Sequence, residues 1–236
     1  MVDLIGCVDS SDECLSIVNN ADLEVEAVEK EKSDEQYYTQ DWFSKETPVW
    51  DKYKTLFFNQ ENIRCLEIGS FEGRSTVYML NNYCNGNNSH MDALDTWEGS
   101  VEHSSDKKDN LYSRFLNNTQ KYIEGNKLEI YRDYSSNTLM KFVQELNKGT
   151  REKYDVIYVD ASHIAKDVLL DAALAWKLLK TGGLMLFDDY EWSYYKNPEM
   201  NPKAGVDGFL SAHNNMYMML HKGYQLHIMK DKDESF

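Results

Sequence analysis

The sequence lacks any apolar run long enough to cross a bilayer, which takes about 20 consecutive apolar residues. Its first 21 residues also lack the basic start and apolar centre of a secretory signal, so we expect neither a signal peptide nor a membrane span. Its four cysteines show no metal-binding or disulfide spacing: Cys7, Cys14, Cys65 and Cys84. These absences predict a protein of the reducing, intracellular cytoplasm.

Basic residues are scarce as well. The chain has 25 Lys and Arg against 40 Asp and Glu, a formal net charge of −15. Without a basic patch, a nucleic acid is not expected as a partner. The acidic surplus suits a neutral or cationic small molecule or a bound metal, although it could equally serve solubility alone.

Composition divides the chain into three parts. Residues 1–36 hold eleven acidic residues and two lysines, few aromatics and no clean periodicity, which predicts a flexible N-terminal arm. Residues 37–60 crowd aromatic side chains around an expected helix over Pro48–Phe58. This segment is predicted to cover a sheet, or alternatively to wall an acceptor pocket. Residues 61–236 would form the main domain.

The chain is organised around Cys65–Thr76, which reads Cys-Leu-Glu-Ile-Gly-Ser-Phe-Glu-Gly-Arg-Ser-Thr. An apolar strand leads into a turn bracketed by Gly69 and Gly73, and a helix is expected from Arg74. Such a unit brings bare backbone and helix amides toward a small molecule. A nicotinamide-dependent dehydrogenase fits less well, because Phe71 stands where that motif needs its second glycine.

Further along the chain, apolar strands alternate with helices. Strands are expected over 62–68, 90–94, 127–131, 154–159 and 184–187, with a closing hairpin of 216–220 and 225–230. Helices are expected over 74–83, 111–124, 137–146, 164–180 and 206–214. The helix over Ile164–Lys180 has Gly182-Gly183 just past its end, a common stop signal. Alternation predicts an α/β fold with a parallel sheet and helices on both faces.

Acidic residues follow four of the five strands before the hairpin: Asp95, Asp133, Asp160 and the pair Asp188-Asp189. Ligands bind at the carboxyl ends of strands in open α/β sheets, so these carboxylates are predicted to border one site. Asp95 lies 26 residues after Gly69, a separation that suits a carboxylate accepting hydrogen bonds from ribose hydroxyls. Each acidic strand end could instead be a helix cap or a turn former.

Three of these carboxylates, Asp160, Asp188 and Asp189, would lie close together if the fourth and fifth strands are neighbours. Like charges at short range raise each other's pKa unless a cation lies among them. Oxygen ligands with room for water suit Mg²⁺, or Mn²⁺ as a substitute. The sequence therefore predicts a divalent-metal site at this edge.

The pattern Glu67-x-Gly69-x-x-x-Gly73 resembles the first motif of class I S-adenosylmethionine-dependent methyltransferases. The segments Tyr-Val-Asp-Ala-Ser-His, ending at His163, and Gly-Gly-Leu-Met-Leu-Phe-Asp-Asp-Tyr, ending at Tyr190, are similar to metal-dependent O-methyltransferases. The likeness is strongest to enzymes acting on sugar hydroxyls, including macrolide sugars, and covers about residues 60–230. It implies a Rossmann-like sheet of seven strands in the order 3-2-1-4-5-7-6, with the last strand antiparallel.

This resemblance also implies roles for particular residues. Those expected to bind S-adenosylmethionine are Glu67, Gly69, Ser70, Gly73, Ser75, Asp95, Trp97, Asp133, Ser135 and Ser136. Those expected to hold Mg²⁺ or Mn²⁺ are Asp160, Asp188 and Asp189. His163 would be the general base beside Asp160, because a histidine can take a hydroxyl proton at neutral pH.

Several alternatives remain open at this point. The acceptor could be a hydroxyl of a sugar or glycan, or a catechol or phenol. The chain could also be a non-catalytic adenosyl-binding module. Structural roles are as compatible with Ser75, Trp97 and Ser136 as cofactor contacts are, and His163 could simply begin a helix. A homo-oligomer is compatible with the sequence.

Overall fold

The structure, a computed structural model, describes residues 36–100 and 110–233. The arm expected over residues 1–36 lies outside the described residues apart from Gln36. Tyr37–Phe236 form a compact unit of their own, and the fold below is that of this unit. None of the helices in the described ranges is long and apolar enough to cross a membrane.

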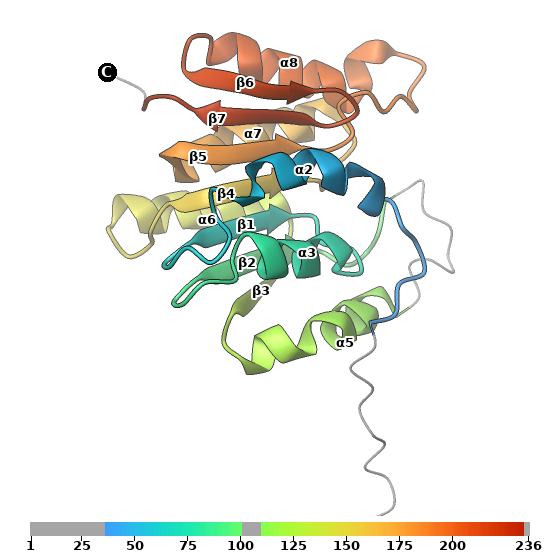
Figure 1. The fold of residues 1–236 in the computed structure, drawn as a ribbon. Helices are drawn as coiled ribbons and strands as arrows, with labels where there is room; N and C mark the ends of the chain where they lie inside the picture. The colour runs from blue at the N-terminus through green and yellow to red at the C-terminus, as the bar shows by residue number, and fades with distance from the viewer. Residues whose placement is uncertain (1–35, 101–109, 234–236) are drawn as a thin grey trace, which may run out of the picture. The chain divides into compact units, whose positions relative to one another are not determined.

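Seven strands form a single sheet in the order β3-β2-β1-β4-β5-β7-β6 (Figure 1). The strands are β1 (Arg64–Ile68), β2 (His90–Asp95), β3 (Leu128–Arg132), β4 (Tyr154–Val159), β5 (Leu179–Phe187), β6 (Tyr217–Lys222) and β7 (Leu226–Lys230). Neighbours from β3 to β5 are parallel, and β7 runs antiparallel to both β5 and β6. The predicted order and the antiparallel last strand are confirmed.

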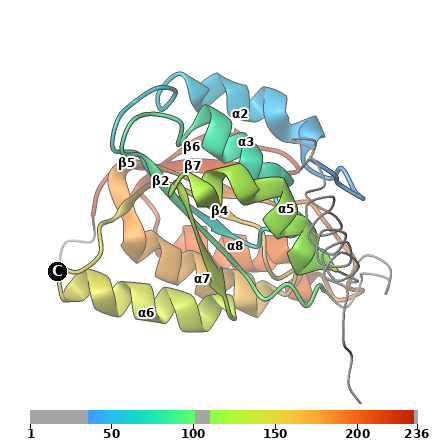
Figure 2. The ribbon, with the colours of Figure 1, turned by 90° about the horizontal axis from the view of Figure 1, so that it is seen from below.

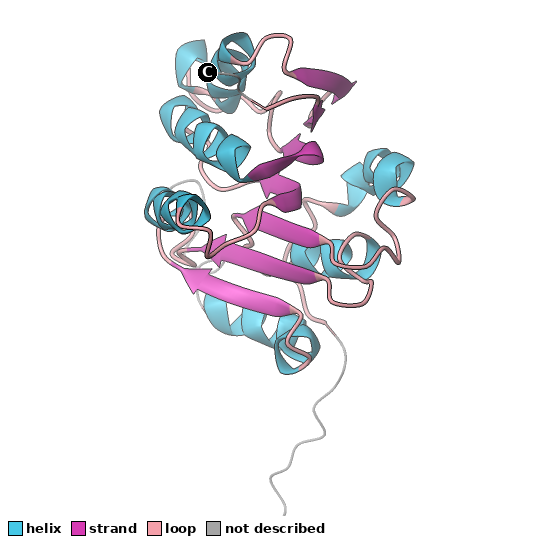
Figure 3. Cartoon of the chain, turned by 90° about the vertical axis from the view of Figure 1, so that its left-hand side faces the viewer, coloured by secondary structure: helices cyan, strands magenta, loops and turns pink. Residues whose placement is uncertain are grey.

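Helices cover both faces of this sheet, as Figures 2 and 3 show. One layer contains α2 (Thr47–Lys54), α3 (Arg74–Asn82) and α5 (Leu111–Glu124), and the other contains α6 (Ser135–Asn147), α7 (Ala165–Leu178) and α8 (Pro202–Ala212). Each layer buries its own core against the sheet, around Phe115 on one face and Phe142 on the other. Full burial of such a side chain contributes about 1.5–3 kcal/mol to folding.

The beginning of β5 differs from the prediction. The helix ends at Leu178 and the strand begins at once with Leu179, so Gly182 and Gly183 lie inside the strand rather than after the helix. Leu179 pairs with Tyr154, and the register then shifts before Val156. A Cβ at Gly183 would approach the Asp155 carbonyl oxygen to 3.0 Å, so the glycine permits the irregular pairing.

The aromatic segment over residues 37–60 contributes both to packing and to a cavity. Its short helix η2 (Ser44–Glu46) leads directly into α2. Trp50 of α2 is fully buried, and its Nε1 donates a hydrogen bond of 2.7 Å to Gln225. Trp42 and Lys45, in contrast, line the cleft described next.

Candidate active site

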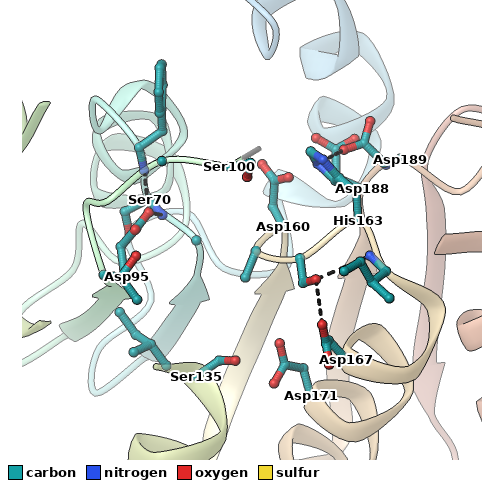
Figure 4. Close-up of a pocket in the computed structure, with 18 of the residues that line it drawn as sticks. Ser70, Asp95, Ser100, Ser135, Asp160, His163, Asp167, Asp171, Asp188 and Asp189 are labelled. Carbon is teal, nitrogen blue, oxygen red and sulfur yellow. Dashed lines mark hydrogen bonds and ion pairs between the residues drawn. The ribbon is translucent and has the colours of Figure 1, made fainter. Parts of the chain in front are cut away.

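A cleft of about 870 Å³ opens at the carboxyl ends of the parallel strands (Figure 4). Its walls come from the segments that follow β1, β2, β3, β4 and β5, together with η2 and the turn between β6 and β7. This is the position at which open α/β sheets bind ligands. Of the residues expected at the site, it is lined by Gly69, Ser70, Ser75, Asp95, Asp133, Ser135, Ser136, Asp160, His163, Asp188 and Asp189.

Gly69 places the turn after β1 against the segment that follows β4. Its φ is +90°, and a Cβ there would lie 2.0 Å from the carbonyl oxygen of Asp160. The amide of Asp160 also donates a hydrogen bond of 2.7 Å to the carbonyl of Ile68. Gly69 is therefore required because two protein backbones meet there, which the ligand-approach interpretation of the sequence did not anticipate.

Gly69→Ala is expected to destabilise the fold and to abolish cofactor binding. Gly182→Ala is the matched control, since Gly182 has a φ of +80° but a Cβ added there would meet nothing within 4 Å among the described residues. The left-handed backbone alone should cost about 1–2 kcal/mol at Gly182, whereas the clash with Asp160 adds to that cost at Gly69. Denaturant unfolding measures the difference, and equal losses in the two variants would contradict this account.

Asp95, at the end of β2, holds the same turn from the other side. One carboxylate oxygen accepts hydrogen bonds from the amides of Ser70 at 2.8 Å and Phe71 at 2.9 Å. The other oxygen accepts from the amide of Trp97 at 2.7 Å. Carboxylate oxygens have about four lone-pair sites in total, so Asp95 could still accept a hydrogen bond from a ligand.

Three expected cofactor residues, Glu67, Gly73 and Trp97, lie behind the cleft wall rather than on it. Glu67 is fully buried and accepts a hydrogen bond of 2.5 Å from Ser75 and another from Thr76. Burial raises the pKa of Glu67 to about 7, and these hydroxyls offset only part of the rise. Glu67 therefore fixes Ser75, which does line the cleft.

Gly73 and Trp97 support the turn in a similar way. Gly73 has a φ of +84° at the start of α3 and packs near Phe115. Trp97 is 4% exposed, and its Nε1 donates a hydrogen bond of 2.9 Å to the carbonyl of Phe71. Trp97 also packs against Tyr112 and Phe115, which fits the structural role left open for it by the sequence.

At the other end of the cleft, Asp160, His163 and Asp189 offer ligand atoms that lie within 4.8 Å of one another. His163 Nε2 is 2.7 Å from Asp189 Oδ2, and the imidazole packs on Trp192 with 4.6 Å between ring centroids. Tyr224 donates a hydrogen bond of 2.7 Å to the other oxygen of Asp189. This arrangement orients both His163 and Asp189.

The charges of this group are unevenly compensated. Burial, with the nearby charges of Asp188 and Asp189, raises the pKa of Asp160 well above its ordinary value. Burial alone would also raise the pKa of Asp189, but the hydrogen bond and charge of His163 outweigh it, so that pKa is lowered. A nearby cation would therefore favour the ionised form of Asp160 more than that of Asp189.

Asp188, the third carboxylate of the predicted metal site, already has protein partners. Its carboxylate accepts hydrogen bonds from Tyr158 at 2.7 Å, from Gln225 at 3.0 Å and from the amide of Asp189 at 2.9 Å. Burial, followed by the charge of Asp189, raises the pKa of Asp188 to about 6. The structure thus groups Asp160 with His163 and Asp189, while Asp188 is already engaged by three protein donors.

This donor set fits a divalent cation. Two carboxylates and an imidazole suit Mn²⁺, and the carboxylates with added water suit Mg²⁺. A second group with similar spacing, His90, Asp92 and Glu129, lies on β2 and β3. There Arg151 already forms an ion pair of 2.7 Å with Asp92, so a protein side chain compensates the negative charge of that group.

The cleft residues that the sequence analysis did not single out include Lys45, Asp167, Asp171 and Tyr224. Asp171 did carry a signal, because it lies three residues after Val168 on the apolar stripe of α7. An acidic residue at a buried helical position calls for an explanation. Lys45 and Tyr224 gave no such signal, because segments distant in sequence bring them to the cleft.

Residues 66–190, more than half of the chain, match the family described as Methyltransferase domain. The sheet order, the turn at Gly69 and the carboxylate at Asp95 are those of a class I S-adenosylmethionine-dependent methyltransferase. The chain belongs to this methyltransferase family, and S-adenosylmethionine is the methyl donor that the family and the fold support.

One curated relative is an uncharacterized protein of Acanthamoeba polyphaga mimivirus, 27% identical over 147 residues. The match covers 61% of this chain and 59% of that protein, so the chain spans about three fifths of the relative's length.

Two similar solved structures are methyltransferases. The O-methyltransferase from Bacillus cereus in complex with S-adenosylhomocysteine (SAH) has a TM-score of 0.54, 14% identity, and coverage of 94% of this chain and 92% of that one. The MycE methyltransferase of the mycinamycin pathway, in complex with Mg, SAH and mycinamycin VI, has a TM-score of 0.55, 14% identity, and coverage of 95% and 64%. At identities this low, the structural likeness shows the shared fold alone.

Proposed function

We propose that this protein is an O-methyltransferase that transfers the methyl group of S-adenosylmethionine to a hydroxyl of a sugar or glycan, with the help of a divalent metal ion. The observation that carries the proposal is the position of Asp160, His163 and Asp189 in the same cleft as Asp95 and the Gly69 turn. One end of the cleft suits the donor, and the other suits an ion and an acceptor.

The donor would use the residues around the glycine turn. Asp95 would accept hydrogen bonds from the ribose hydroxyls, in addition to the backbone amides that it already binds. Ser70 supports this assignment, because its hydroxyl is buried without a hydrogen-bond partner among the described residues and borders the cleft. Ser75 and the first amides of α3 would receive the methionine carboxylate.

Methyl transfer to oxygen requires an aligned hydroxyl that has lost its proton. His163, held by Asp189 at 2.7 Å, would accept that proton. Asp160 and Asp189 would hold the metal ion, and Asp188 would fix the backbone of Asp189 through its hydrogen bond to the amide. A divalent ion held there would lower the pKa of a nearby acceptor hydroxyl.

Aromatic side chains favour a ring-shaped acceptor. Trp42, Trp192 and Tyr195 line the cleft, and Trp192 packs against His163. An aromatic face next to the base could hold a sugar ring through apolar contact while a hydroxyl reaches His163. A catechol or phenol is the second candidate, since the stacked pair of Trp192 and Tyr194 offers a flat surface.

A two-step experiment tests the proposal. Calorimetry should detect SAH binding both with Mg²⁺ and with chelator, because the donor residues lie apart from the acidic group. Methyl transfer from labelled S-adenosylmethionine should then appear with a panel of sugars and oligosaccharides, and chelator should remove it.

Turnover confined to a parallel panel of catechols and phenols would replace the sugar acceptor with the second candidate. Binding of SAH without turnover on either panel would favour a non-catalytic adenosyl-binding module. Folded protein that does not bind SAH at all would contradict the methyltransferase reaction itself.

A further inference from the structure

Asp171 presents a buried polar atom at the cleft that the proposed reaction does not use. The residue borders the cleft yet is only 1% exposed. One of its carboxylate oxygens has no hydrogen-bond partner within the described residues. Because buried polar groups in folded proteins are almost always hydrogen bonded, this oxygen calls for a donor supplied by a ligand.

The surroundings of Asp171 define a polar end of the cleft. Asp171 lies in the second turn of α7, and Ser135, the first residue of α6, lies beside it. One turn earlier, Asp167 accepts a hydrogen bond of 3.1 Å from Ser162. In Figure 4, Ser135, Asp167 and Asp171 lie together on the side of the drawn cleft opposite Asp188 and Asp189.

The chemistry of the donor indicates which of its groups would meet Asp171. S-adenosylmethionine has two amino groups, one beside its carboxylate and one on the adenine ring. The amino group beside the carboxylate would lie with it near Ser75 and the start of α3, and the ribose would lie at Asp95. The 6-amino group of adenine is therefore the N–H donor left for this end of the cleft.

We propose that Asp171 selects adenine by accepting a hydrogen bond from the 6-amino group at its unpartnered carboxylate oxygen. This inference rests on the proposed use of S-adenosylmethionine. An ionised carboxylate can only accept hydrogen bonds, so it would reject a purine with an oxygen at the same position. Burial raises the pKa of Asp171 to about 7, and an added N–H donor would favour the ionised form.

The test compares the affinity of two ligands, SAH and its deaminated analogue, in which a 6-oxo group replaces the 6-amino group. Wild-type protein should bind SAH at least about tenfold more tightly, because the analogue leaves the Asp171 carboxylate facing an oxygen. In Asp171→Asn this ratio should fall to about threefold or less, since an amide can present either an N–H or an oxygen.

Asp207→Asn is the matched control. Asp207 lies on α8 and accepts hydrogen bonds from Lys203 and Tyr190. It does not line the cleft, so the variant should keep the wild-type affinity ratio. Thermal unfolding confirms that each variant is folded. If Asp171→Asn does not fold, the wild-type ratio still decides, because equal affinity for the two ligands overturns the role of Asp171.

The outcomes separate this inference from the proposed function. Tight SAH binding with an unchanged ratio in folded Asp171→Asn would overturn adenine selection and leave the methyltransferase proposal standing. Failure of wild-type protein to bind either ligand would overturn both.

Discussion

Asp160→Asn is expected to lower methyl-transfer turnover at least about a thousandfold while SAH affinity stays within about threefold. The substitution keeps the shape of the side chain and removes a charge from the group that would hold the metal ion. Loss of several kcal/mol of stabilisation at the reacting oxygen corresponds to a loss of this size. Steady-state kinetics and calorimetry on the same preparation measure the two effects.

The same variant should remain folded, and metal binding should distinguish it from wild type. Asp160 lies near Asp188 and Asp189, and its raised pKa means that its charge is unfavourable when no cation is near. Removing the charge should therefore leave the unfolding temperature unchanged or higher in chelator. Mg²⁺ or Mn²⁺ should raise the unfolding temperature of wild type but not that of Asp160→Asn. A parallel loss of SAH affinity would instead place Asp160 in the donor site.

Asp95→Ala should have the opposite profile, with SAH affinity lowered at least about a hundredfold. The variant removes the acceptor for the ribose hydroxyls and also the partner of three backbone amides, those of Ser70, Phe71 and Trp97. Each buried amide left unpaired costs about 1–3 kcal/mol, so the glycine turn should lose its binding geometry. Calorimetric titration with SAH measures the loss.

Asp155→Ala is the matched control for Asp95→Ala. Asp155 also accepts a backbone hydrogen bond within the sheet, from the amide of Arg64 at 2.9 Å, but it does not line the cleft. Its removal should lower stability and leave SAH affinity near that of wild type. Affinity in Asp95→Ala within about threefold of wild type would contradict both the ribose contact and the role of Asp95 in holding the turn for binding.

The elements that the sequence predicted best are those with strong local patterns. The helix over Leu111–Glu124 and the strand over Tyr154–Val159 have the predicted bounds, because their apolar periodicity ends where the element ends. The predicted start of β5 was wrong, because Leu179 continues the apolar pattern of the preceding helix. Its pairing with Tyr154, distant in sequence, determines the strand.

The candidate site divides in the same way. The acidic strand ends could be predicted to border one cleft, since parallel strands present their carboxyl ends at the same edge. The partners of those carboxylates could not be predicted. Tyr158 and Gln225 engage Asp188 from β4 and from the residue before β7, and only the packed sheet brings them together.

The sequence by itself therefore determined the α/β class, the strand–turn–helix at Gly69 and the row of acidic strand ends, because each follows from local spacing and from alternation. Only the folded chain revealed that Glu67 and Trp97 lie behind the cleft, that His163 pairs with Asp189, and that Asp171 keeps an unpaired oxygen at its edge, as judged within the described residues. The physical reason is that burial and hydrogen-bond partnership depend on contacts between distant segments, which composition and periodicity do not encode.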